Sequence, residues 1–471
     1  MSTPARAPAD QPGTSAKPSP HRVSYRDSRP ETVALIVAAV GIVAAFTVEA
    51  LGVWDNVHAW LPPLSAYFEP TLLSPGLPMS VAVAWAVISS GPALAERLGW
   101  RRLLLVSTVA GLTWSVSLAL IRGWSGIAEP LTNEHEYLVD VPRVDDLTQV
   151  IPEFTDRIDS SPQTNWVTHV AAHPPLMFLC FLWLDRIGLG GPVWGAVAIT
   201  LLSATTVPAV LVTLRRLGDE ARARAAAPFL VLTPLVIWSV VSADGVLAAA
   251  AAWGLALLAS AAVARGWRSI AISVAAGIVL GLAVNLSYGL VLAGTLSLAV
   301  LAAARSWRPL PPAVLAALAV VGVFALLGFW WLAGQQELVD RYYRGIASER
   351  PQSYWIWANL AVVCFCLGPA GVAAIGRWLQ QLRRPDAATT TAGEGLLGRP
   401  ATWWLAVGAF AAILAADLSG LSRSEVERIW LPFMVWLVPL AAWLATGDRR
   451  RWLIAQAGWA ITISCVLRFT W

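Results

Sequence analysis

A concentration of carboxylates between residues 131 and 146 is the first feature that could carry chemistry. The stretch LTNEHEYLVDVPRVDD holds Glu134, His135 and Glu136 side by side, and three aspartates follow them. Only 13% of the 471 residues are charged, so this stretch stands out from the rest of the chain. Such carboxylates can hold a divalent metal ion or accept a proton. The simpler alternative is a solvated loop whose charges keep it in water.

The longer polar segment that begins at residue 122 closes with HVAAHPPL, residues 169–176. It contains three of the five histidines, His135, His169 and His173. The proline after His173 fixes its own φ angle and pushes His173 toward an extended conformation. This is a constrained element where the chain enters the next apolar run. A zinc site from the three histidines is conceivable, but their spacing matches no established zinc pattern.

Two further groups of polar residues lie at the ends of apolar runs. Asp244, in SADG, could cap a helix or border a polar cavity. The stretch LSRSEVERIW, residues 421–430, contains two arginines, Arg423 and Arg428, with Glu425 and Glu427 between them. These side chains could form a structural ion-pair cap between helices. Alternatively, their guanidinium groups could bind phosphate, because the planar fork matches phosphate oxygens.

The elements that must position these residues are membrane helices. Hydrophobic residues make up 57% of the chain, the mean hydropathy is +0.62, and apolar runs of membrane length recur. We therefore predict an all-α polytopic membrane helix bundle of about 13 spans plus a short re-entrant segment. The expected spans lie near 32–53, 78–97, 102–121, 193–214, 226–243, 245–264, 269–287, 289–304, 312–333, 355–375, 402–420, 429–446 and 452–469.

Arginine clusters predict the orientation of these spans. Basic segments occupy every second connection, so we expect those connections to be cytoplasmic. The net charge of +4 is explained by these clusters, and we do not expect nucleic acid as a partner. Residues 1–30, rich in Pro, Ser and Ala, are expected to be a disordered cytoplasmic tail, and 385–399 a cytoplasmic linker. Residues 31–471 then form one integral membrane domain.

The acidic and motif-bearing connections consequently fall on the opposite, extracytoplasmic side. They are the long 122–173 loop, the 334–354 loop and residues 421–430. This assignment of sides requires that the apolar run 174–187 does not cross the membrane completely. At about fourteen residues, the run is short for a complete span. The expected location is the cell membrane, with a cytoplasmic N-terminus and an extracytoplasmic active site.

The order of these features resembles the glycosyltransferase C superfamily, which includes the protein O-mannosyltransferases and the lipid A aminoarabinose transferases. In many members a long outer loop begins Asp-Glu-x-x-Tyr and a later His-Pro-Pro-Leu opens the next apolar run. Here Glu134 and Tyr137 match, whereas Asn133 replaces the leading Asp. The architecture also resembles actinobacterial membrane proteins of this type.

The resemblance implies an inverting transfer of a sugar from a polyprenyl-phosphate donor to an acceptor hydroxyl group. Since Asn133 cannot act as a base, Glu134 or Glu136 is expected to take the proton. The residues expected to bind the donor phosphate are Arg428, Arg423, Arg341 and Arg344. The residues expected to orient substrate are Tyr137, His173, Asp244 and Glu425.

A metal cofactor is left open, because Glu134, Glu136 and Asp244 could hold Mg²⁺ or Mn²⁺. Membrane lipids are expected partners, and the acceptor could be a glycan, a lipid or a protein. Two other functions remain possible. A transporter or lipid flippase would need charged or broken helices near the bilayer midplane, and a non-catalytic membrane assembly protein would leave the acidic loop unexplained.

Overall fold

The computed structural model describes residues 29–48, 50–54, 56–161, 163–383 and 398–469. The expected tail of residues 1–30 lies almost entirely outside this part of the chain. So does most of the expected linker of residues 385–399.

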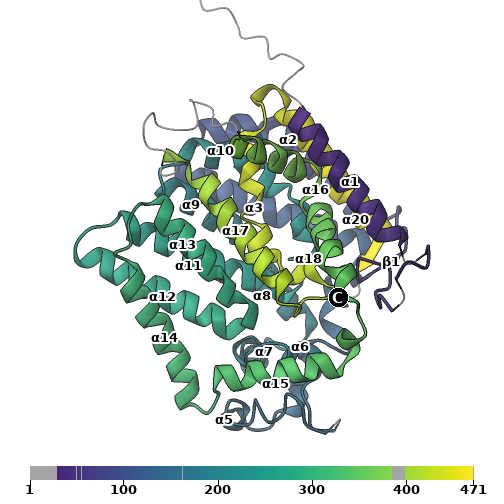
Figure 1. Ribbon diagram of the computed structural model, residues 1–471, viewed down its shortest axis with the longest axis vertical. Coiled ribbons are helices and arrows are strands. Elements are labelled where there is room, and N and C mark those ends of the chain that lie inside the picture. The colour runs from purple at the N-terminus through teal and green to yellow at the C-terminus, as the bar shows by residue number, and fades with distance from the viewer. Residues whose placement is uncertain (1–28, 49, 55, 162, 384–397, 470–471) are drawn as a thin grey trace, which may run out of the picture.

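Helices make up nearly all of the regular structure, as the apolar runs predicted, and within the described residues they form one bundle (Figure 1). The α-helices are α1 (Arg29–Thr47), α2 (Gly76–Arg97), α3 (Trp100–Ala119), α4 (Ser125–Ala128), α5 (Leu147–Val150), α6 (Thr168–Ala171), α7 (Leu176–Arg186), α8 (Pro192–Ala204), α9 (Thr206–Arg216), α10 (Glu220–Val231), α11 (Ala243–Val263), α12 (Trp267–Leu286), α13 (Ala293–Ala303), α14 (Leu310–Leu326), α15 (Trp331–Arg344), α16 (Gln352–Arg383), α17 (Ala401–Leu418), α18 (Val426–Ile429), α19 (Leu431–Met434) and α20 (Arg449–Val466). The 3-10 helices are η2 (Leu120–Arg122), η3 (Pro130–Thr132), η4 (Tyr137–Val139), η5 (Val141–Arg143), η6 (Pro234–Ile237), η7 (Tyr288–Leu292), η8 (Ile346–Ser348), η10 (Val438–Trp443) and η11 (Thr446–Asp448).

The protein is an all-α, multi-pass membrane protein. Among the described residues, 8 helices are long and apolar enough to cross a membrane, or up to 10 if each of two bent pairs counts as one span. The expected number of about 13 is therefore not confirmed. Helix α7, in the run expected to be re-entrant, has 11 residues and extends only about 17 Å, which is too short to cross the hydrocarbon core.

Helix α16 shows how this fold satisfies a break inside an apolar helix. Gly368 has a φ of 70° and precedes Pro369, so the regular hydrogen bonding stops there. The side chain of Gln456, from α20, donates to Leu367 O at 2.8 Å and accepts from Ala370 N at 2.9 Å. One buried amide thus replaces the missing backbone partners, as a non-aqueous surrounding demands.

A small antiparallel sheet joins two distant parts of the chain. Strand β1 (Ala66–Phe68) pairs with β2 (Leu467–Phe469) in the register Tyr67 to Arg468. Through this pairing, the connection between α1 and α2 lies against the end of α20. The pairing also places Arg468 beside residues that line two cavities described below.

The 122–173 loop is folded around its own core. Trp166 and Phe154 are fully buried, and the Trp166 indole N–H donates to Phe154 O at 3.0 Å. The guanidinium of Arg157 covers the Trp166 ring at 3.5 Å. In Figure 1 the helices of this loop gather with α7 and α15 at one end of the bundle. The loop is thus packed against the rest of the bundle through its own buried aromatic residues.

Candidate active site

Arg428 lies at the centre of a buried group of ionisable side chains from separate parts of the chain. Its guanidinium contacts Asp244 Oδ2 at 3.2 Å, Glu425 Oε2 at 2.9 Å and His169 Nε2 at 2.5 Å. Glu136 joins through His169, whose Nδ1 lies 2.8 Å from Glu136 Oε1. These five residues are called the Arg428 cluster below.

The contacts of His169 determine which ring nitrogen carries its proton. A guanidinium has only donors, so Nε2 of His169 accepts from Arg428. In the neutral ring the proton is then on Nδ1, which faces Glu136 in a close contact that is not aligned as a hydrogen bond. His169 N also donates to His135 O at 3.0 Å, which fixes α6 against the segment that carries Glu136. The pair therefore has the arrangement of a carboxylate behind an imidazole base.

Asp244 reaches the cluster from the first turn of α11. The helix cap is Ser242, whose hydroxyl accepts from Asp244 N at 3.3 Å and donates to Asp244 Oδ2 at 3.0 Å. Ser242, and not Asp244 as one of the sequence interpretations proposed, therefore caps the helix. The carboxylate of Asp244 is left to pair with Arg428.

Glu425 is held in an unusual backbone conformation. Its φ is 61°, and that of Ser424 is 87°. Non-glycine residues in this region cost about 1–3 kcal/mol each and persist where the surroundings impose them. Here Ser424 Oγ lies 3.3 Å from Ser65 Oγ, and Arg350 donates to Arg423 O at 2.7 Å. These contacts turn Glu425 toward Arg428.

A cavity of about 330 Å³ opens beside the cluster. It is called the Glu425 cavity here. Its wall contains His58, Ala59, Trp60, Ser65, Tyr67, Asn133, Glu134, His135, His169, Arg350, Glu425 and Arg468. The Glu425 side chain is 31% exposed and that of Arg428 only 8%. Glu425 and His169 therefore face the cavity, and Arg428 lies behind them.

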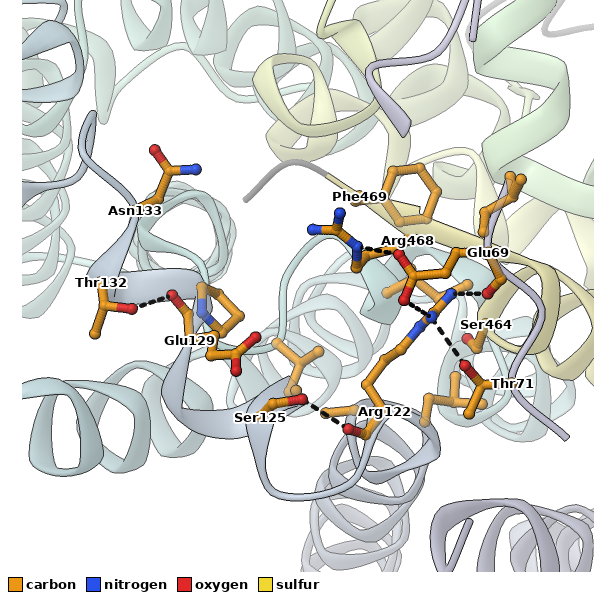
Figure 2. A pocket seen from close by; sticks show the side chains of 17 residues that line it. Glu69, Thr71, Arg122, Ser125, Glu129, Thr132, Asn133, Ser464, Arg468 and Phe469 are labelled. Atoms are coloured by element: carbon orange, nitrogen blue, oxygen red, sulfur yellow. Dashed lines mark hydrogen bonds and ion pairs between the residues drawn. The ribbon is translucent and has the colours of Figure 1, made fainter. Parts of the chain in front are cut away.

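A second cavity, of about 660 Å³, adjoins the first and shares Asn133 and Arg468 with it. It is called the Arg122 cavity. Figure 2 shows Arg122 and Arg468 both reaching Glu69. The distances are 3.1 Å from Arg122 Nη1 to Glu69 Oε1 and 2.6 Å from Arg468 Nε to Glu69 Oε2. Arg468, on strand β2, therefore lies in the walls of both cavities, whereas Arg122 lines only the second.

Neighbouring charges set the ionisation of the cluster. Burial raises the pKa of Glu136, but His169 and Arg428 outweigh it, so the pKa lies below its ordinary value. The same opposition, with burial against Arg428 and His169, leaves the pKa of Glu425 lowered. Both carboxylates are therefore ionised at neutral pH. Burial opposes the charge of Arg428 too, yet Asp244 and Glu425 leave its pKa raised.

Tyr137 and His173 pack behind the cluster. Tyr137 is 1% exposed and stacks on Phe181 with ring centroids 5.2 Å apart. Burial, reinforced by Glu136, places its pKa well above the ordinary value. His173 donates from Nδ1 to His169 O at 2.9 Å, and burial lowers its pKa. Both residues can position His169 without facing the Glu425 cavity.

Four of the residues expected at the site are not members of the Arg428 cluster. Arg341 donates to Ile158 O and Trp166 O. Arg344 pairs with Asp159. Arg423 donates to Gln352 Oε1, Ala347 O and Arg350 O. These contacts tie the three arginines to backbone oxygens and to the side chains of Asp159 and Gln352. Glu134 lines the Glu425 cavity, but its side chain is 87% exposed and contacts His135 instead of the cluster.

Several residues at the site were not expected in a role. His169 was noted only for its type, although its spacing of four from His173 places the two on one face of a helical turn. Arg350 and Arg468 line the Glu425 cavity, and no sequence signal marked them. The aromatic residues Trp60 and Tyr67 also line it, from a connection that carried no recognised motif.

The carboxylates considered for Mg²⁺ or Mn²⁺ do not converge. Glu136 faces His169, Asp244 faces Arg428, and Glu134 is exposed. Across the part of the chain that the structure describes, no group of three or more His, Cys, Asp or Glu side chains could hold a metal ion. Glu134, Glu136 and Asp244 therefore do not share one metal site.

Comparison with known proteins finds only distant likeness. No protein-family model matches the chain, and no curated protein matches it. The solved structures that match the chain include two of ArnT and one of an oligosaccharyltransferase. ArnT from Cupriavidus metallidurans in the apo state is 16% identical, with 64% of this chain and 54% of that chain covered and a TM-score of 0.41.

The same ArnT bound to undecaprenyl phosphate is 16% identical, covering 65% of this chain and 57% of that chain, with a TM-score of 0.40. The Archaeoglobus fulgidus oligosaccharyltransferase, in complex with Zn and sulfate, is 14% identical. The match covers 77% of this chain and 53% of that chain, with a TM-score of 0.42. The chain thus spans little more than half the length of these structures. Similarity at this level establishes neither the family nor the activity of the chain.

Proposed function

We propose that this chain is an integral-membrane glycosyltransferase. It moves a sugar from a polyprenyl-phosphate donor to an acceptor hydroxyl group, with inversion at the anomeric carbon. The observation that carries the proposal is the Glu136–His169 pair, held by Arg428 at the wall of the Glu425 cavity. The acceptor is a glycan, a lipid or a protein on the extracytoplasmic side.

His169 takes the proton of the acceptor hydroxyl group. Its Nε2 is the unprotonated nitrogen, and Glu136 behind Nδ1 stabilises the imidazolium as it forms. Glu136 therefore keeps the role of essential carboxylate, but it acts through His169 because its own side chain is only 7% exposed. Entry of the acceptor requires its hydroxyl to replace Arg428 at Nε2.

The charge of the cluster suits glycosyl transfer. Glu136, Asp244 and Glu425 supply three carboxylates against the single guanidinium of Arg428. A sugar develops positive charge at its anomeric centre as the bond to the leaving group breaks. Glu425, the cluster carboxylate most accessible from the cavity, is placed to stabilise that charge.

The donor phosphate binds to the cations that line the cavity. Arg350 and Arg468 both lie in its wall. Arg350 uses its two Nη atoms to donate to Arg423 O and His58 O, and its Nε has no partner among the described residues. Arg428, expected from the sequence to bind phosphate, instead organises the carboxylates and His169.

A transfer assay tests the proposal. Membranes containing the full chain receive a panel of radiolabelled polyprenyl-phosphate sugars, and loss of label from the lipid is followed. Glu136→Gln and His169→Ala are each expected to slow transfer by about 10²–10⁴-fold, the usual contribution of a general base. Glu153→Gln, an exposed glutamate of the same loop, serves as the matched control.

Three outcomes would contradict parts of the proposal. Unchanged transfer by Glu136→Gln removes the pair from the mechanism. Loss of transfer in Glu134→Gln alone assigns the base to Glu134. Substrate-dependent flux in proteoliposomes, with no covalent product, identifies a transporter.

A further inference from the structure

A third cavity, of about 920 Å³, lies far from the Arg428 cluster. It is called the Arg216 cavity. Its wall contains Gly99, Trp100, Arg101, Arg102, Leu104, Val212, Arg215, Arg216 and Val263. These residues come from the beginning of α3 and the ends of α9 and α11.

Helix α11 shows where this cavity lies in the membrane. Asp244, in the Arg428 cluster, is in its first turn, and Val263, in the cavity wall, is its last residue. At 1.5 Å per residue these positions are about 29 Å apart along the helix. That distance is close to the thickness of the hydrocarbon core. The Arg216 cavity therefore lies at the membrane boundary opposite the active site.

The cavity wall has four guanidinium groups and no carboxylate. Arg215 is the one with a partner, since its Nε lies 2.8 Å from Glu220 Oε2 and its guanidinium stacks 4.6 Å from the centre of the Trp100 ring. Arg101, Arg102 and Arg216 form no hydrogen bond or ion pair with any residue that the structure describes. Their charges converge on one hollow, and a phosphate group could neutralise them through paired N–H donors.

The other side of the cavity is apolar. Leu104, Val212 and Val263 come from three different membrane helices and line the wall beside the arginines. A soluble phosphate ion would leave this wall without a partner. A phospholipid would use both parts, because its phosphate lies at the membrane boundary and its acyl chains run along the helices. We propose that the Arg216 cavity binds the headgroup of an anionic phospholipid.

Native mass spectrometry of the full chain provides the test. Protein released from nanodiscs of equal phosphatidylglycerol and phosphatidylcholine is expected to retain phosphatidylglycerol. Arg101→Gln/Arg102→Gln/Arg216→Gln should weaken this binding by about 100-fold, a factor of roughly five for each arginine. The matched control is Arg268→Gln/Arg308→Gln/Arg450→Gln, which removes three exposed arginines that lie outside the cavity wall.

A second variant covers the case in which the triple variant does not fold. Val212→Trp fills the cavity from its apolar wall and leaves every arginine in place, and it should also lose phosphatidylglycerol. Equal retention by Val212→Trp and the unaltered protein would overturn the proposal. So would equal losses in the triple variant and its control, or complete displacement of the lipid by millimolar inorganic phosphate.

Discussion

Arg428 helps two carboxylates, Glu136 and Glu425, to remain ionised in a buried site. It is 6% exposed, and a charge in such a place is stable only when it is paired and hydrogen bonded. Asp244 and Glu425 provide the pairing, and His169 accepts a further N–H. Removal of Arg428 would leave Asp244 and Glu425 buried without their cation. The cluster is therefore a single unit whose members cannot be exchanged independently.

Glu427 makes the stability of the protein depend on pH. It is fully buried, and its Oε1 accepts a hydrogen bond from Ser65 N at 3.1 Å. Burial raises its pKa from 4.5 to about 7, so the folded protein holds a proton that the unfolded chain releases. Stability should therefore fall as pH rises from about 4.5 to 7, by an amount on the order of 3 kcal/mol.

Apparent melting temperatures measured from pH 5 to pH 8 check this expectation. Glu427→Gln cannot ionise, so it should gain stability relative to the unaltered protein as pH rises through this window. Glu153→Gln, whose side chain is exposed in the folded protein, should follow the unaltered protein throughout. Parallel curves for Glu427→Gln and the unaltered protein would show that Glu427 is not protonated in the folded state.

The sequence could mark the polar residues of the site but not their partners. Asp244, Glu425 and Arg428 were noticed because they interrupt apolar runs, and the structure places them in contact. Arg341 stands in an equally polar context, yet it donates to two backbone carbonyls. Only the fold shows which oxygens surround a guanidinium. Arg350 was not noticed because its contribution to the cavity depends on loops distant in sequence. The roles of these residues remain predictions.

Among the elements, apolar runs without an internal proline were predicted closely, and so was α2, which keeps Pro92 inside the helix. The expected spans 245–264 and 402–420 correspond closely to α11 and α17. The expected span 226–243 breaks into α10 and η6, with Pro234 at the start of η6. The expected span 429–446 divides in a similar way at Pro432 and Pro439. Proline removes a backbone donor and ends a regular helix, although hydropathy alone does not register the interruption.

Packing between α11 and α8 yields a prediction at the scale of elements. A Cβ at Gly245 would lie 2.2 Å from Ser239 O and 2.6 Å from Ser203 Oγ. Gly245→Ala should therefore push the first turn of α11 away from α8, at a cost of about 1–3 kcal/mol. Because Asp244 is the preceding residue, transfer activity should fall as well.

Gly294→Ala in α13 is the matched control, since a Cβ there meets no described atom within 4 Å. That substitution should leave stability unchanged or raise it by up to about 1 kcal/mol through helix propensity. Melting temperature and transfer rate measured on both variants distinguish the two effects. A Gly245→Ala protein as stable and active as Gly294→Ala would refute the close contact.

For the whole molecule, the bundle gathers polar segments from distant positions at one end. The 122–173 loop, the start of α11 and residues 424–428 meet in the Arg428 cluster. The Arg216 cavity lies at the other end of α3, α9 and α11. A bundle with a carboxylate-rich site at one boundary and arginines at the other matches the polarity of membrane proteins, in which basic segments stay cytoplasmic.

This polarity predicts which parts of the chain a reagent outside the cell can reach. Glu153→Cys places a thiol on an exposed position of the 122–173 loop, and Arg308→Cys places one between α13 and α14. The four native cysteines, Cys180, Cys364, Cys366 and Cys465, are buried or partly buried and are first replaced by Ala. A membrane-impermeant maleimide should then label Glu153→Cys in intact cells, and Arg308→Cys only after the membrane is opened. The reverse pattern would place the Arg428 cluster in the cytoplasm, where the acceptor would have to be a cytoplasmic molecule.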